Sequence, residues 1–209
     1  MGLREMKMER TRQLIADTAI SLFREHGFAA TTIEQIAAAA EVGARTVYRY
    51  YPTKEALVVR FIEDTLDIAL EDLRALPEHA PLPQALYQVI ESVRRTVADD
   101  PERLIDVYRI ANRTPSIQAQ LSAGTWNWRQ DLAEEILRRT SGDFAELVAA
   151  LAAANIMNII EISVQEWVRA EEHTAMDRAI ERGLELLRTG AVPVPAPPVD
   201  EPTGSTPRD

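Results

Sequence analysis

The stretch from Thr31 to Lys54, TTIEQIAAAAEVGARTVYRYYPTK, decides the fold of this chain. Thr31 and Thr32 stand before apolar residues that repeat at helical spacing, and either hydroxyl can cap the helix that follows. Gly43 suits a tight turn because it lacks a Cβ, and the helical pattern restarts at Ala44. The stretch therefore predicts two short helices joined by a turn.

The second of these helices has two different faces. Val47 and Tyr51, four residues apart, would anchor it to the core. Arg45, Tyr48 and Arg49 would project together from the opposite face, because residues three and four apart are neighbours on a helix. Such side chains can hydrogen-bond guanine edges and phosphates in the major groove of DNA. For a bare pair of arginines, the alternative is a solvated helix face.

The context favours DNA. Residues 11–57 resemble the N-terminal domain of TetR-family transcriptional regulators, although the family usually has Ala-Gly-Val-Ser where this chain has residues 40–43, and Phe where it has Tyr51. This departure removes the usual turn glycine and the serine that often caps the reading helix. The residues that match the family pattern are Ile15, Ala19, Leu22, Phe23, Gly27, Phe28, Thr31, Thr32, Ile36, Ala37, Thr46, Val47, Tyr48, Tyr50, Pro52, Lys54, Glu55 and Leu57.

The resemblance implies a ligand-responsive regulator, most often a repressor, that binds an inverted-repeat DNA operator as a homodimer. In that reading Arg45 and Arg49 contact bases, and most of the other residues hold phosphates. The predicted DNA-binding residues are Thr31, Thr32, Gly43, Ala44, Arg45, Thr46, Tyr48, Arg49, Tyr50 and Lys54.

Composition bounds the remaining possibilities. The 209 residues are 46% hydrophobic and rich in helix-forming types, which predicts an all-α protein. Without cysteine there is no disulfide or thiol site, and the three histidines lack the spacing of metal ligands, so we expect no cofactor. We expect a cytoplasmic location without membrane contact, because the chain has no apolar signal segment and no uninterrupted apolar run of about 18 residues.

The net charge of −10 is unevenly distributed. Residues 1–60 hold 9 basic and 7 acidic residues, whereas residues 61–209 hold 14 basic and 26 acidic residues. Because salt screens charges beyond a Debye length of about 8 to 10 Å, a distant acidic body does not cancel a local basic face. The acidity of the whole chain is therefore compatible with binding to DNA.

Breaks in the helical pattern divide the chain into a helix-turn-helix domain (1–53), a connector helix with a ligand-binding and dimerisation domain (54–189), and a proline-rich tail (190–209) that should be disordered or extended. Prolines and polar clusters mark the joints between the helices. Besides the two short helices, the predicted helices are 10–26, 54–76, 82–98, 101–112, 116–139, 143–170 and 174–188.

The last two helices are candidates for a dimer interface. The helix at 143–170 is rich in alanine, which permits close backbone approach, and together with the next helix it could form half of an intermolecular four-helix bundle. An ordinary intrachain core explains the same pattern, but TetR-like proteins typically dimerise through these helices. The predicted interface residues are Ala150, Ala154, Ile180, Gly183, Leu184 and Leu187.

Polar and aromatic residues inside the apolar helices suggest a ligand pocket, although core hydrogen bonds or surface exposure explain each of them equally well. A weak similarity to TetR relatives described as binding acyl-coenzyme-A-like ligands favours a small hydrophobic or amphipathic ligand, with Arg129 as partner for an anionic group. The predicted pocket residues are Tyr108, Asn112, Trp126, Arg129, Asn155, Asn158 and Ile162, with Glu161 and Trp167 in the same polar and aromatic set.

Two other functions are compatible with the sequence. A DNA-binding regulator without a small-molecule ligand, controlled by a protein partner, would have a packed regulatory domain with no cavity. An enzyme with a vestigial helix-turn-helix would work through carboxylates such as Glu161, but no nucleophile–base pair or metal set is visible.

Overall fold

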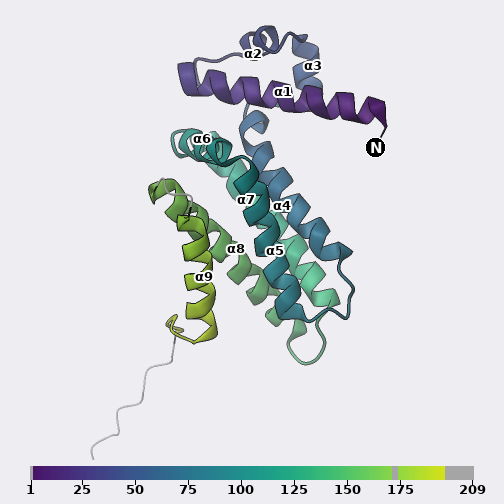
Figure 1. The fold of residues 1–209 in the computed structure, drawn as a ribbon, viewed down its shortest axis with the longest axis vertical. Helices are drawn as coiled ribbons and strands as arrows, with labels where there is room; N and C mark the ends of the chain where they lie inside the picture. The colour runs from purple at the N-terminus through teal and green to yellow at the C-terminus, as the bar shows by residue number, and fades with distance from the viewer. Residues whose placement is uncertain (1, 171–173, 196–209) are drawn as a thin grey trace, which may run out of the picture.

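A computed structural model of the chain describes residues 2–170 and 174–195. Within these ranges the chain forms nine helices and no strand, so the all-α prediction is confirmed. Three helices form one end of the molecule and six form an elongated body beneath them (Figure 1). The helices are α1 (Leu3–His26), α2 (Ile33–Ala39), α3 (Ala44–Tyr50), α4 (Ala56–Ala75), α5 (Leu82–Asp99), α6 (Pro101–Asn112), α7 (Pro115–Arg138), α8 (Ala145–Ala170) and α9 (Ala175–Arg188).

Most helix ends lie within two residues of their predicted positions, and α1 is the exception. It begins at Leu3 rather than Arg10 because Gly2 caps it, with the Gly2 amide donating to the Glu5 carboxylate at 2.7 Å. At α6, the Asp100 carboxylate accepts from the Arg103 amide at 3.3 Å, which explains the sharp start at the predicted proline. Residues 190–195 are outside any helix, and the rest of the predicted tail lies outside the described residues.

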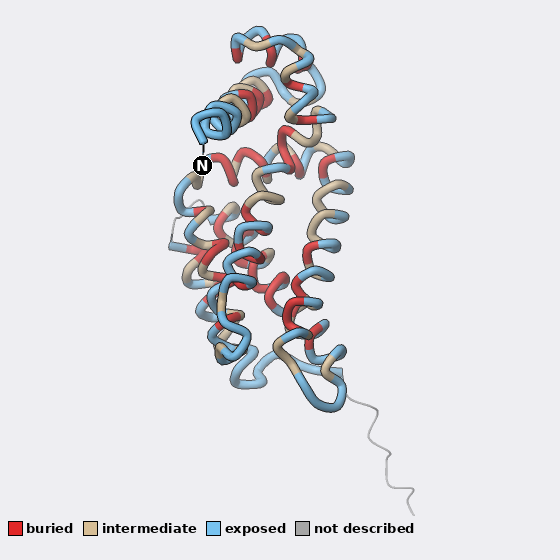
Figure 2. The backbone as a smooth tube through the Cα atoms, turned by 90° about the vertical axis from the view of Figure 1, so that its right-hand side faces the viewer, coloured by how far each residue is buried: buried red, intermediate tan, exposed pale blue. Residues whose placement is uncertain are grey.

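The buried residues form two apolar cores, and Figure 2 shows them on the helix sides that face one another. The first core joins α1, α2 and α3, but it is completed by Leu57 of α4, Val107 and Ala111 of α6, and Ile117 of α7. All four of these side chains are buried. The end formed by α1, α2 and α3 therefore shares its core with three helices of the body.

The second core fills the body and fixes the connector helix α4. The Trp128 indole N–H donates to the Leu66 carbonyl oxygen at 2.7 Å. Near the end of α4, the Arg139 guanidinium donates to the carbonyl oxygens of Leu73 and Leu76, at 2.8 Å and 3.1 Å, and also pairs with Glu135. These contacts hold α4 against α7 along the body.

Helix α8 is long and apolar enough, by length and composition alone, to cross a membrane. Its Ala153, Met157 and Ile160 are buried in the body core. The residues on its opposite side face outward.

Candidate nucleic-acid interface and ligand cavity

Helix α2, the first helix of the predicted helix-turn-helix, has a complete N-terminal cap. The Gln35 amide donates to the Thr32 hydroxyl at 3.2 Å, and the Thr32 amide donates to the Gln35 side-chain oxygen at 2.8 Å. Thr31 has a different role, because its side chain is only 1% exposed and its hydroxyl donates to the Gly27 carbonyl oxygen at 2.9 Å. The phosphate contact predicted for Thr31 is therefore not supported by its geometry, and Thr31 instead holds the loop between α1 and α2.

The turn between α2 and α3 is built around Glu41 rather than Gly43. Glu41 has a positive φ of 54°, whereas Gly43 has a φ of −77° that any residue can adopt. The Val42 amide donates to the Ala37 carbonyl oxygen at 2.9 Å, and the Glu41 amide donates to that of Ala38 at 3.2 Å. These bonds are the C-terminal capping motif that usually carries glycine at its left-handed position. Where the family pattern has glycine, this chain thus has a glutamate in the left-handed conformation.

Helix α3 presents the predicted reading face to solvent. Arg45 and Arg49 are exposed, and Tyr48 between them is 49% exposed. Val47 and Tyr51 are buried on the other side, and the Tyr51 hydroxyl donates to the Arg12 carbonyl oxygen at 3.1 Å. The sequence pattern therefore located both faces of this helix.

The remaining residues of the DNA-binding set lie around this face. Tyr50 is half-buried, and the guanidinium carbon of Arg49 lies 4.9 Å from the centre of the Tyr50 ring. Gly43 is exposed at the cap of α3, while Ala44 and Thr46 are half-buried in its first turn. Tyr50 is thus placed to orient Arg49 rather than to project by itself.

The Lys54 ammonium group makes its polar contacts within the chain. Its ammonium donates to the carbonyl oxygens of Phe28 and Thr31, at 2.7 Å and 2.9 Å, and lies 4.3 Å from the centre of the Phe28 ring. The predicted phosphate contact of Lys54 is therefore not supported by its geometry. Lys54 connects the residues just before α4 to the loop that precedes α2, and so it positions the helix-turn-helix.

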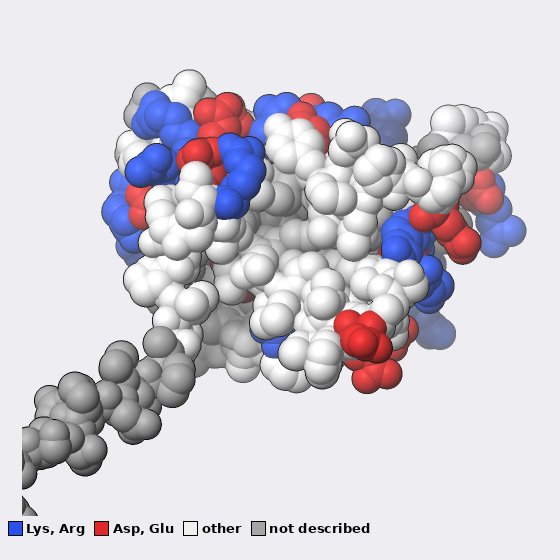
Figure 3. Space-filling view, turned by 90° about the horizontal axis from the view of Figure 1, so that it is seen from below, with Lys and Arg blue, Asp and Glu red and all other residues white. Residues whose placement is uncertain are grey.

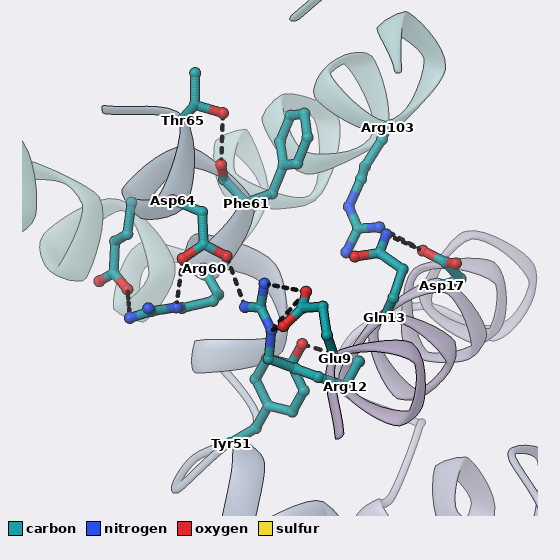
Figure 4. A network of polar contacts seen from close by, with 11 residues as sticks. Glu9, Arg12, Gln13, Asp17, Tyr51, Arg60, Phe61, Asp64, Thr65 and Arg103 are labelled. Carbon is teal, nitrogen blue, oxygen red and sulfur yellow. Dashed lines mark hydrogen bonds and ion pairs between the residues drawn. The ribbon is translucent and has the colours of Figure 1, made fainter. Parts of the chain in front are cut away.

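A polar network ties α1 to the connector (Figure 4). The Arg12 guanidinium contacts Asp64 of α4 at 2.6 Å and Glu9 of its own helix at 2.8 Å. Arg60 approaches the other Asp64 oxygen at 2.8 Å. The Arg12 hydrogen bond lowers the pKa of Glu9, so the Glu9 carboxylate stays ionised near neutral pH.

Helix α6 makes a second connection to α1. Arg103 of α6 pairs with Asp17 of α1, and the Asp106 carboxylate lies 3.5 Å from the Arg24 guanidinium of α1. Arg103 is almost fully buried and also lies over the Phe61 ring of α4. The orientation of the DNA-binding end is therefore coupled to the positions of both α4 and α6.

A cavity of about 340 Å³ lies between α4, α6, α7 and α8. Tyr108 and Asn112 of α6 line it, as predicted. Burial, with a smaller contribution from the negative charge of Glu161, raises the pKa of the Tyr108 phenol to about 12, so it is a neutral hydroxyl near pH 7. The lining residues are Ile62, Leu66, Tyr108, Ala111, Asn112, Gln118, Leu121, Ser122, Thr125, Met157, Ile160, Glu161 and Gln165.

The other five predicted pocket residues do not line this cavity. Trp126 is 57% exposed, and the Arg129 guanidinium lies 4.3 Å from the centre of its ring, so both belong to the surface of α7. Asn155, Asn158 and Ile162 are exposed on the outward face of α8. Helix α8 has apolar residues on all sides. The spacing of residues alone therefore cannot tell which of its sides faces the cavity and which faces outward.

The residues that sequence reasoning missed have a recognisable spacing. Met157 and Gln165 lie one turn before and after Glu161 on α8, which the sequence had singled out, and Gln118 and Ser122 lie four residues apart on α7. Each set forms one helix face of mixed polarity, which is the composition expected of a ligand pocket. Among the described residues, no group of three or more His, Asp or Glu is placed to hold a metal ion.

The outward face of α8 is an exposed apolar strip. Leu151 is 57% exposed, Ile162 is similarly exposed, and Phe144, just before the helix, is 78% exposed with a φ of 63°. Asn155 and Asn158 lie between them. Strips of this kind, and strained bulky residues beside them, mark interaction surfaces.

The predicted dimer residues divide between this surface and the interior. Ala150 is exposed and Ala154 half-buried on α8, and Leu187 of α9 is partly exposed. Ile180 is buried, and a Cβ on Gly183 would lie 2.5 Å from the Ile159 Cδ1 of α8. These two positions serve contact between α8 and α9 within the chain, and Leu184 also packs against the body core. Their contacts within the chain therefore do not support a role for them in a dimer interface.

Known protein families match both the N-terminal helices and the body of the molecule. Residues 15–61 match the family described as bacterial regulatory proteins, tetR family, and residues 80–192 match the MftR C-terminal domain. The regulator TcmR of Streptomyces glaucescens is 29% identical over 201 residues, covering 90% of this chain and 87% of TcmR. A candidate mycofactocin biosynthesis regulator of Mycobacterium tuberculosis, MftR, is 24% identical over 176 residues, covering 84% and 88%.

The fold is shared with solved structures. FadR of Thermus thermophilus, a TetR-family repressor in complex with lauroyl-CoA, superposes with a TM-score of 0.60 at 24% identity, covering 91% of this chain and 100% of FadR. NalD of Pseudomonas aeruginosa, a repressor of a multidrug efflux pump, gives 0.57 at 19% identity, covering 86% and 96%. With family matches over the DNA-binding end and over more than half of the chain in the body, this protein belongs to the TetR family and is a DNA-binding transcriptional regulator.

Proposed function

We propose that this regulator is a homodimeric repressor that binds an inverted-repeat operator in the cytoplasm and leaves it when a small amphipathic ligand occupies the cavity between α4, α6, α7 and α8. A two-fold dimer presents two copies of α3, which explains how a helix of seven residues achieves useful specificity. The regulator relatives and the helical fold support this function over that of an enzyme.

The observation that carries the proposal is the position of α6. Its Tyr108 and Asn112 line the cavity, while Val107 and Ala111 are buried in the core of the DNA-binding end. On the same helix, Arg103 pairs with α1. A ligand that displaces the cavity side of α6 must therefore disturb the packing of the DNA-binding helices.

The cavity also favours ligand control over control by a protein partner alone. A regulator without a ligand is expected to have a packed regulatory domain, whereas about 340 Å³ lies open between the helices here, within the range of small-molecule sites. FadR of Thermus thermophilus, which shares the fold, was solved in complex with lauroyl-CoA, and this supports a small-molecule ligand. The cavity residues of this chain differ from the predicted set, so the ligand class must follow from the observed lining.

The outward strip of α8 supports the dimer. Val148, Leu151, Asn155, Asn158 and Ile162 alternate at spacings of three and four residues, which is the repeat of a helix that packs along a partner helix. None of these residues is charged, so the strip can face its own copy across a two-fold axis without repulsion. The two asparagines can each donate and accept hydrogen bonds with a symmetric partner, and polar residues in such a seam define its register. Seen from the end of the body away from α1–α3, the middle of the surface is largely uncharged (Figure 3).

A cavity-filling variant tests the proposed switch. The operator is first obtained by selecting bound fragments of the source genome with the purified protein. Operator affinity is then measured by fluorescence anisotropy with decylamine, decanol and decanoate as amphipathic probes. We expect at least one probe to lower wild-type affinity about five- to 150-fold, and Ser122→Trp to bind operator normally without responding.

The matched control is Ala123→Trp, because Ala123 is the exposed neighbour of Ser122 and does not line the cavity. This variant should respond like the wild type. A probe response that persists in Ser122→Trp would place the ligand elsewhere, and a wild type that keeps full operator affinity with every probe would contradict release by amphipathic ligands.

A further inference from the structure

We propose that the cavity selects a ligand with a hydrogen-bond-donating, cationic end, such as a protonated amine, and that the Glu161 carboxylate is the group that selects it. This inference rests on the proposed function and specifies the ligand class of the same cavity. It departs from the anionic ligand and the Arg129 partner that the sequence suggested.

The charge of the cavity is the first observation. Among the described residues that line it, Glu161 is the single charged side chain, and the other polar groups are uncharged hydroxyls and amides. Ile62, Leu66 and Leu121 supply apolar surface from α4 and α7. An anionic group placed among these residues would lose its hydration, meet no positive side chain and lie near a carboxylate of the same sign.

The second observation is that Glu161 has no partner. Its carboxylate is half-buried, and no hydrogen bond or ion pair of the described residues involves it. Burial raises its pKa, and the positive charge of Arg129 partly opposes this rise. A carboxylate that lines a cavity without a partner in the chain is a candidate binding group for a cation.

Arg129 is the positive side chain of the protein that could pair with Glu161 in place of a cationic ligand, but it stacks on Trp126 instead. Its guanidinium is stacked on the exposed Trp126 ring, 4.3 Å from the ring centre, on the surface of α7. It influences Glu161 through its charge but does not line the cavity. The carboxylate therefore remains available to a ligand.

Tyr108 completes the polar end of the site. It lines the cavity from α6, its phenol is neutral, and the negative charge of Glu161 contributes to its raised pKa, which indicates that the two groups lie near each other. An ammonium group has three donors, so it can bond to the Glu161 carboxylate and to the oxygens of Tyr108 or Asn112 together. The alkyl part would then lie against the apolar residues of α4 and α7.

The test compares three probes that share one alkyl chain and differ in the end group. Binding of decylamine, decanol and decanoate to the full-length protein is measured by isothermal titration calorimetry near pH 7, below the concentrations at which they form micelles. Because a hydrogen bond to a charged partner is stronger than a neutral one, decylamine should bind about five- to tenfold tighter than decanol, and decanoate should bind most weakly.

Glu161→Gln keeps the size of the side chain and removes its charge. In this variant decylamine and decanol should bind within about twofold of each other, and the disadvantage of decanoate should shrink. Glu146→Gln is the matched control, because it makes the same change at an exposed position of α8 outside the cavity. The control should keep the full preference for the amine.

The inference is overturned if decanoate binds as tightly as decylamine, if no probe binds, or if the preference for the amine survives in Glu161→Gln. Operator binding separates this result from the proposed function. Selective amine binding that leaves operator affinity unchanged supports the inference and contradicts the proposed switch. Operator release by all three probes alike supports the switch and overturns the inference.

Discussion

Val107 and Tyr108 are consecutive residues of α6 that face two different parts of the molecule. Val107 is fully buried in the core that holds α1, α2 and α3, whereas Tyr108 lines the cavity in the body. One helix therefore forms a wall of both compartments. Any displacement of α6 by a ligand changes the packing of the DNA-binding end without an intermediate element.

Breaking the link between α6 and α1 should weaken the switch. Arg103→Met keeps an unbranched apolar side chain but removes the guanidinium that pairs with Asp17 and lies over the Phe61 ring. We expect the ligand-induced loss of operator affinity to fall severalfold, because coupling energies of about 1 to 3 kcal/mol depend on such contacts. Operator binding with and without ligand measures this. Arg95→Met on α5 is the control, and an unchanged response in Arg103→Met would exclude this contact from the coupling.

Glu41→Gly should stabilise the protein. Glu41 has a positive φ, which costs a residue with a Cβ about 1 kcal/mol, and glycine removes that cost. The same substitution at Glu71, an exposed interior position of α4, should destabilise the protein by about 1 kcal/mol. Urea unfolding of both variants provides the comparison, and equal destabilisation would show that Glu41 is not strained.

The arginines of α3 and Lys54 should respond differently to truncation. Arg45→Ala or Arg49→Ala should relax base preference at one operator position, by about 1 to 3 kcal/mol, without lowering the melting temperature. Lys54→Ala should destabilise the fold by about 1 to 3 kcal/mol, because two carbonyl oxygens lose their charged donor. Operator selection and thermal melting distinguish the two effects. If Lys54→Ala weakens DNA binding with unchanged melting, the structural role assigned to Lys54 is wrong.

Two arginine substitutions should separate dimerisation from folding. Leu151→Arg places a charge in the outward strip of α8 and should yield a folded monomer in sedimentation at micromolar concentration. Gly183→Arg should instead destabilise the protomer by about 1 to 3 kcal/mol through overpacking, because a Cβ there already meets Ile159. A dimeric Leu151→Arg variant would refute the proposed interface.

Glu161→Gln should stabilise the ligand-free protein near neutral pH. The pKa of Glu161 is raised on folding, so the folded state binds its proton more tightly than the unfolded state does. The ionised Glu161 carboxylate therefore destabilises the folded state. This destabilisation grows as the pH rises from the unfolded-state pKa through the folded-state pKa, and it is absent below the unfolded-state pKa. We expect a gain below about 1 kcal/mol because solvent screens a half-exposed group. Urea unfolding across this range should show the wild type and variant converging in acid, and a constant difference would indicate another cause.

The sequence by itself located the helices and the reading face of the DNA-binding unit. Val47, Tyr51 and Arg45 were assigned to the correct sides of α3 because a short amphipathic helix has one apolar face, and period alone identifies it. Prolines and caps marked most helix ends for the same local reason. The family pattern over residues 11–57 supplied the function.

The tertiary structure decided the roles that depend on contacts between distant segments. Lys54 and Thr31 match the family pattern, but their bonds to the loop after α1 give them structural roles that spacing could not reveal. In α8, which is apolar on nearly every side, Asn155 and Glu161 are equally conspicuous in sequence, yet only Glu161 reaches the cavity. The reason is physical: local pattern determines which residues form a helix, but its rotation against its neighbours is set by packing of the whole body.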